Sequence, residues 1–143
     1  MTGAIIRKAM TGGRLTLLLV VLAALPVAGC GTDVAYTRAP DRRVEVDLAE
    51  YSISPERIQV KAGRVTLVAH NNGRLTHNLA VVQFKRPKSG EQERMYGKPT
   101  ETLFPGQTRS TTVDLKPGKY RLICTLANHD NLGQWGELKV VGG

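Results

Sequence analysis

The chain has 143 residues, of which 41% are hydrophobic and 5% aromatic, and its formal net charge is +8. Three of the 20 basic side chains lie within the first 30 residues, which leaves 17 basic against 12 acidic side chains in the remainder. The basic residues of this remainder are scattered and lack interleaved aromatic residues, so the composition excludes a typical nucleic-acid-binding surface, and the length predicts one domain.

The N-terminal segment has the pattern of an export signal. Three basic side chains precede an apolar run at residues 15–25, which is shorter than the roughly 20 residues that a membrane-spanning helix needs. The following Val-Ala-Gly-Cys, which ends at Cys30, resembles a bacterial lipobox, whose cysteine is acylated and becomes the new N-terminus. We therefore expect a lipoprotein signal peptide at residues 1–29 and fatty acyl chains such as palmitate on Cys30. Cleavage elsewhere by an ordinary secretory pathway stays open.

This signal predicts a location. The protein is expected at the cell membrane of a bacterium, held by its lipid anchor on the extracytoplasmic side. Residues 30–42 have little periodicity and are predicted to form a flexible tether between the lipid and the domain.

Residues 43–143 are predicted to form the domain, because alternation of apolar and polar residues begins there. Short strands separated by turn signals indicate an all-β protein, an antiparallel Greek-key β-sandwich of about seven to eight strands. The expected strands cover residues 44–49, 57–61, 65–69, 77–84, 109–115, 119–124 and 135–141.

Residues 85–108 interrupt this rhythm with Lys, Gly, Pro, Glu and Gln and few aliphatic residues. A loop of this length in a compact domain is usually functional or mobile. The sequence leaves room there for a short helix around residues 90–96.

Two segments carry candidate metal ligands. Cys124, His129 and Gln134 are spaced as C-x4-H-x4-Q, and His77 lies in a Thr-His-Asn run far upstream. A thiolate, two imidazoles and one weak fourth donor are the ligand set of a blue-copper electron-transfer site. One short loop can supply the first three ligands, whereas His77 must come from the end of a separate strand.

The stretch CTLANHDNLGQWGELKVV, residues 124–141, resembles the ligand loop of the cupredoxins, the type 1 copper proteins, whose usual pattern is CTxPGHxxxGMxGxLxV. Residues 71–82 resemble the strand that carries the first histidine of that family, and the resemblance covers about residues 44–142. Two positions depart from the pattern. Gln134 stands where most members have the axial methionine, as in the stellacyanin branch, and Ala-Asn at 127–128 replaces Pro-Gly.

The resemblance implies a site for one copper ion. Its four ligands would be His77, Cys124, His129 and Gln134. Asn78 and Thr125, which follow two of these ligands, would hydrogen-bond to each other and tie the ligand strands together. Three alternatives stay open: a solvent-facing Gln134, a fourth ligand supplied by Met95 from the long loop, or a disulfide between Cys124 and Cys30 that would abolish the site.

The resemblance further implies single-electron transfer through transient contact with a redox partner protein. We expect a monomer and no enzyme, since the sequence shows no second histidine cluster, nucleophile motif or paired acidic constellation. The alternative function is a copper chaperone, a scavenger or an accessory module in metal assembly, which would bind copper through the same residues without redox cycling. A copper-free docking scaffold is a third class, against which the retained cysteine and both histidines argue.

Overall fold

The computed structural model describes Met1, Gly3 and residues 35–143. Apart from Met1 and Gly3, the predicted signal peptide lies outside these residues, and so does Cys30. Within the described part of the chain there is no α-helix, and the one short 3-10 turn, η1, covers Pro40–Arg42. No helix among the described residues is therefore long and apolar enough to cross a membrane.

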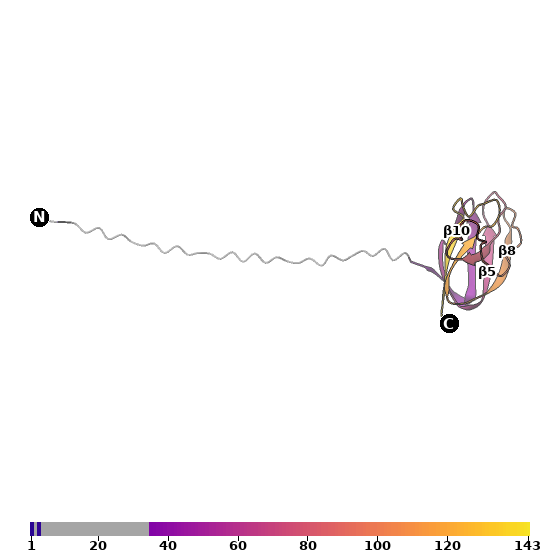
Figure 1. Cartoon of the computed structure of the whole chain (residues 1–143), viewed down its shortest axis with the longest axis horizontal. Coiled ribbons are helices and arrows are strands. Elements are labelled where there is room, and N and C mark those ends of the chain that lie inside the picture. Colours follow the sequence, from indigo (N-terminus) through magenta and orange to yellow (C-terminus); the bar gives the residue numbers. More distant parts are fainter. Residues whose placement is uncertain (2, 4–34) are drawn as a thin grey trace. The chain divides into compact units, whose positions relative to one another are not determined.

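Within residues 35–143, ten strands form two sheets that pack face to face as a sandwich (Figure 1). The six-stranded sheet contains, in spatial order, β1 (Thr37–Ala39), β4 (Arg57–Lys61), β10 (Trp135–Val141), β9 (Gly118–Ile123), β6 (Ala80–Gln83) and β7 (Met95–Tyr96). The four-stranded sheet contains β3 (Ser52–Ser54), β2 (Arg43–Ala49), β5 (Gly63–Asn71) and β8 (Thr108–Leu115). The predicted all-β sandwich is confirmed, with ten strands where seven to eight were expected.

Both sheets are mixed, whereas the sequence pattern suggested antiparallel pairing. β1 and β10 each run parallel to β4, and β2 runs parallel to β5, while the other strand pairs are antiparallel. A period of two residues shows that a segment is a strand with one buried face. It contains no information on the direction of the neighbouring strand, and for this reason the parallel pairs were not predicted.

The core follows from the alternation that the sequence shows. In β2, Val44, Val46 and Leu48 are buried while the residues between them are exposed. The inward side chains of β5, β9 and β10 meet them in one cluster that includes Leu67, Leu122 and Leu138. Each such buried side chain stabilises the fold by about 1.5–3 kcal/mol. The packed core therefore fixes the positions of the strands and of their ends at the edge of the sandwich.

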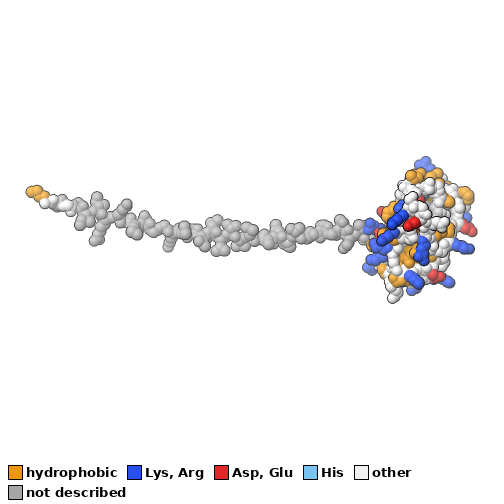
Figure 2. All heavy atoms as spheres, viewed as in Figure 1, with side chains coloured by type: hydrophobic (Ala, Val, Ile, Leu, Met, Phe, Trp, Pro, Cys, Tyr) orange, Lys and Arg blue, Asp and Glu red, His pale blue; other side chains and the backbone are white. Residues whose placement is uncertain are grey.

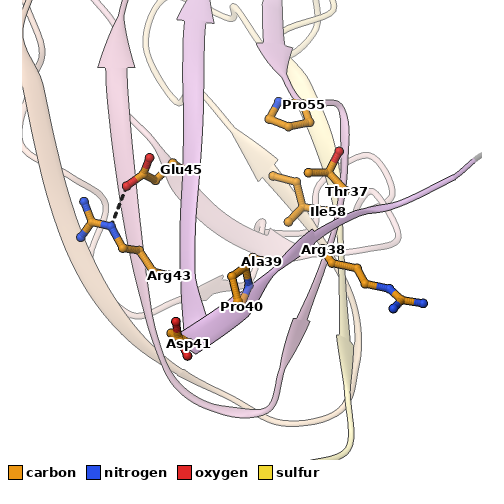
Figure 3. Close-up of a pocket in the computed structure, with 9 residues that line it drawn as sticks. All are labelled: Thr37, Arg38, Ala39, Pro40, Asp41, Arg43, Glu45, Pro55 and Ile58. Atoms are coloured by element: carbon orange, nitrogen blue, oxygen red, sulfur yellow. Dashed lines mark hydrogen bonds and ion pairs between the residues drawn. The ribbon is translucent and has the colours of Figure 1, made fainter.

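The end of the predicted tether belongs to the sandwich. Residues 37–39 pair with β4 as strand β1, from Thr37 opposite Ile58 to Ala39 opposite Val60, and η1 follows directly. A strand of three residues is too short to show periodicity, so the prediction of a tether through residue 42 was wrong for its last six residues. A hollow beside this segment, between Pro40, Pro55 and Ile58 among others, contains none of the candidate ligands (Figure 3).

The predicted long loop is also partly ordered by pairing. Residues 95–96 form β7 at the edge of the six-stranded sheet, and Leu103 forms an isolated antiparallel bridge with His77. Residues 90–96 contain no helix. Figure 2 shows Lys and Arg side chains spread over the visible face of the sandwich and not gathered in one stripe.

Candidate metal centre

Three of the predicted ligands meet at one end of the sandwich. A ring nitrogen of His77, the sulfur of Cys124 and a ring nitrogen of His129 all lie within 4.8 Å of one another, and all three residues are buried. The Cys124 sulfur is 3.6 Å from Nδ1 of His129. Antiparallel pairing of β6 with β9, with Ala80 opposite Ile123, brings His77 beside Cys124 across the long sequence separation.

The loop between Cys124 and β10 presents His129 through a series of tight turns. The His129 amide donates to the Leu126 carbonyl at 2.9 Å, and the Gln134 amide donates to the His129 carbonyl at 3.0 Å. Ala127 and Asn128 have φ angles of 47° and 57°. Asn adopts this left-handed conformation readily, whereas Ala pays about 1–2 kcal/mol for it, so hydrogen bonds within the loop must offset local strain.

The backbone of His77 is fixed by the returning long loop. Its amide donates to the Leu103 carbonyl at 3.0 Å, and the Leu103 amide donates to the His77 carbonyl at 2.7 Å. The Asn71 side-chain amide donates to the carbonyls of Leu75 and Leu103, at 2.8 and 2.9 Å. These bonds shape the turn before His77 and hold the histidine against the sandwich.

Asn78 and Thr125 are placed as the resemblance implied. The Asn78 side-chain amide donates to the Thr125 hydroxyl, and the Thr125 backbone amide donates to the Asn78 side-chain oxygen, both at 2.8 Å. This reciprocal pair joins the residues that directly follow His77 and Cys124, and therefore fixes the two ligand strands in one register.

Buried polar atoms without partners show that these residues fit a metal. Among the described residues, neither ring nitrogen of His77 nor Oε1 of Gln134 has a hydrogen-bond partner. An unpaired buried polar group costs about 1–3 kcal/mol, and a metal ion held by one nitrogen of His77 and by Oε1 of Gln134 would remove that cost for these two atoms. With the Cys124 sulfur and the second imidazole, the donors form the set that selects copper in type 1 sites.

The protonation of the ligands follows from their burial. Burial lowers the pKa of His77, and the nearby His129 lowers it further, so the His77 ring is neutral and keeps a free lone pair. Burial also raises the pKa of the Cys124 thiol, and the backbone amides of Asn78 and Leu126 oppose this only in part. A metal ion held by Cys124 would therefore have to displace the thiol proton.

The side chain of Gln134 is fully buried, so it does not face solvent. Its Nε2 donates to the Ala49 carbonyl at 2.8 Å and lies 3.5 Å from the Ser52 carbonyl. Both partners are carbonyl oxygens that only accept, so the amide nitrogen must face them and Oε1 is free for the site. Met95, the alternative fourth ligand, is exposed on β7, and the alternative disulfide to Cys30 involves a residue outside the described range.

A turn that the sequence analysis did not single out contacts three candidate ligands. Residues 49–52 join β2 to β3, and the carbonyls at both ends of this turn bind Gln134. The Tyr51 ring lies edge-on to His129, with ring centroids 5.6 Å apart. The Glu50 carboxylate lies 3.9 Å from Nε2 of His77. No spacing motif marks these residues, because each contacts a ligand from a distant segment.

Arg86, at the start of the long loop, is a further residue that the sequence analysis missed. Its guanidinium donates to the Asn131 side chain at 2.9 Å, to the Asp130 carbonyl at 3.1 Å and to the Asp130 carboxylate at 3.3 Å. Both partners directly follow His129 in the ligand loop. One function of the long loop is therefore to clamp the ligand loop from outside.

The chain matches the model of a known protein family. The family model described as a cupredoxin-like domain matches residues 15–134. No curated protein matches the sequence significantly.

Similar solved structures share the fold. Dithionite-reduced auracyanin from the photosynthetic bacterium Roseiflexus castenholzii is 19% identical, with a TM-score of 0.60 over 72% of this chain and 99% of that chain. Auracyanin B is 20% identical, with a TM-score of 0.58 over 75% and 91% of the two chains. Auracyanin A, a blue copper protein from Chloroflexus aurantiacus, is 19% identical, with a TM-score of 0.55 over 69% and 99%.

Replacing Arg86 by Ala should loosen the ligand loop. Exposed ion pairs contribute about 0–1 kcal/mol, so the free energy of unfolding should fall by no more than about that amount. Amide hydrogen exchange at Asn131 and Leu132, whose amides bond within the loop, should accelerate. Arg43→Ala is the control, because it removes an exposed 2.6 Å ion pair with Glu45 that touches no candidate ligand. Equal protection of the loop amides in both variants would contradict the clamp.

Proposed function

The chain belongs to the cupredoxin-like domain family, and we propose that it is a single-electron carrier that holds one type 1 copper ion. The observation that carries the proposal is the buried cluster of His77, Cys124 and His129, together with the donor atoms of His77 and Gln134 that lack a partner among the described residues. Bound copper supplies a one-electron couple, while the protein sets its geometry and surroundings. No substrate turnover is part of this proposal.

The surroundings of the cluster suit electron transfer because they restrict movement of the ligands. The Leu103 backbone fixes His77, the Asn78–Thr125 pair joins the ligand strands, and the Ala49 carbonyl holds Gln134. Ligands held by several independent contacts keep nearly one arrangement in both oxidation states. Burial of the three ligands in the cluster also keeps water from the site.

We propose that electrons leave the protein near His129, a residue that is 6% exposed. Exposed apolar side chains occur in the segments around it: Tyr51 contacts the ring, Leu132 belongs to the ligand loop, and Leu75 lies in the turn before His77. Charged residues such as Asp130 and Arg86 stand among them. A small, partly polar surface of this kind suits a weak and transient contact with a redox partner.

Membrane anchoring is a separate part of the proposal. It is supported by the basic start, the short apolar run and the Val-Ala-Gly-Cys sequence that ends at Cys30. We propose that Cys30 is acylated and that the copper domain works as a monomer on the extracytoplasmic side of a bacterial membrane.

The test of the copper site is the visible spectrum of the full chain loaded with Cu(II). The wild type should be blue, because the thiolate of Cys124 transfers charge to copper, and a redox titration should give a reversible one-electron couple. Cys124→Ser should bleach the band, whereas Cys30→Ser, the matched loss of the other cysteine, should keep it. A colourless wild type would refute the site. A blue protein without a reversible couple would favour the chaperone or scavenger function.

Replacing Gln134 by Met should raise the reduction potential. The thioether is softer than the amide oxygen and stabilises the reduced ion, and a tenfold change in a one-electron equilibrium corresponds to about 59 mV. Without metal the stability of the variant should change little, because the half-buried Ala49 carbonyl loses its donor while the unpaired buried Oε1 is removed, and the two effects have similar size and opposite sign. Gln59→Met on β4 is the control for the same chemical change away from the cluster. An unchanged potential and spectrum in the Gln134 variant would show that its oxygen is not a ligand.

Replacing Cys30 by Ser should prevent lipid attachment. Two or more acyl chains give stable membrane anchoring, which one chain does not, so the wild type should fractionate with membranes. The variant should stay uncleaved or appear in the soluble fraction. Intact-mass analysis decides the point: an unmodified Cys30 in the mature wild-type protein, or cleavage at another bond, would refute the anchor.

A further inference from the structure

We propose that Glu50 is a positioning residue for the copper site, whose carboxylate keeps the His77 proton on Nε2, frees Nδ1 for the metal and favours the oxidised ion. The inference rests on the proposed function and deepens it, because it names a device that sets the redox balance of the site. It concerns a residue in the turn at 49–52 that neither supplies a ligand nor belongs to the ligand loop.

The first observation is the position of the carboxylate. Oε1 of Glu50 lies 3.9 Å from Nε2 of His77, whose side chain is completely buried. This separation exceeds hydrogen-bond length, so the contact is electrostatic. Nε2 has no hydrogen-bond partner among the described residues, and the carboxylate is thus the charged group that stands next to it. Because the two ring nitrogens lie on different sides of the imidazole, the nitrogen left for the metal is Nδ1.

The second observation is that the carboxylate is held in place. The backbone amides of Arg74 and Leu75 both donate to Oε1 of Glu50, at 2.5 and 2.8 Å. A Cβ atom at position 73 would lie 2.6 Å from the same oxygen, so Gly73 leaves the space that the carboxylate occupies. The turn before His77 is therefore shaped around Glu50. The same two amides lower the pKa of the Glu50 carboxyl, which keeps it ionised.

The chemical effect follows from the two tautomers of a neutral imidazole ring. A neutral ring carries one proton, and the partner of one nitrogen decides which nitrogen is free to bind a metal. A carboxylate beside Nε2 favours the proton there and makes Nδ1 a more basic ligand, as carboxylates do for histidine ligands of other metal sites. A fixed negative charge next to the ligand also stabilises the more highly charged oxidation state.

The tautomer can be measured on the metal-free full chain by nitrogen-15 NMR of the His77 ring. The wild type should carry its proton mainly on Nε2. Glu50→Gln, which removes the charge at constant shape, should shift the population toward Nδ1–H. Gly73→Ala should act in the same direction, because the added methyl displaces the carboxylate and keeps its charge, and it gives the readout where Glu50→Gln does not fold.

The redox effect can be measured on the copper-loaded full chain. Glu50→Gln should move the Cu(II)/Cu(I) equilibrium at least about threefold toward Cu(I), which corresponds to about 28 mV because a tenfold change is about 59 mV. Glu50→Asp, which retains the charge, should recover at least half of this difference. Asp47→Asn is the matched control, since it removes the same charge from β2 where the carboxylate bonds Asn72 and no ligand, and its shift should be smaller.

The outcomes separate this inference from the function on which it rests. A wild type that is not blue refutes the copper site, and the tautomer of the metal-free chain still decides whether Glu50 controls His77. A blue, redox-active protein in which Glu50→Gln keeps both the wild-type potential and the wild-type tautomer overturns the role of Glu50. A shift of equal size in Asp47→Asn would also overturn it, because the effect would then be one of net charge.

Discussion

The antiparallel pairing of β6 with β9 is the constraint on which the metal site depends. It places Ala80 opposite Ile123, and the same register sets Asn78 against Thr125 just beyond the strand ends. A slip of one residue turns every side chain to the other face of a sheet, so the register decides whether His77 and Cys124 meet at all. The core resists such a slip, because the slip would move Val81, Tyr120 and Leu122 out of the main core cluster and would place residues of the smaller cluster on the other face in their stead.

The parts of the site that lie in one stretch of sequence could be predicted, and the parts assembled from distant segments could not. Cys124, His129 and Gln134 lie in one loop whose spacing is visible in the sequence, and His77 begins an apolar segment with a recognisable pattern. Glu50 and Arg86 reach the site only through the packing of a turn and a loop against it. Their neighbours in the sequence are ordinary polar residues, so no local pattern distinguishes them from solvated surface.

The fold shows the same division. Alternation in β2 predicted which of its residues are buried, because that signal is local. The parallel pairing of β2 with β5 depends on a chain path that crosses to the other sheet through β4, and strand β1 depends on an edge that β4 leaves open. Pairing direction and short edge strands are properties of the assembled sandwich. The sequence therefore predicted the architecture well and the topology poorly.

The donor atoms of His77 and Gln134 that lack a partner among the described residues link the lifetime of the protein to copper supply. A ligand that binds only the folded state stabilises it, by about 2.7 kcal/mol at a hundredfold excess over its dissociation constant. Proteases that cleave transiently opened chains act according to the population of the open form. Copper-free molecules should thus be degraded sooner than loaded ones, which would enrich the surviving population in loaded protein when the metal is scarce.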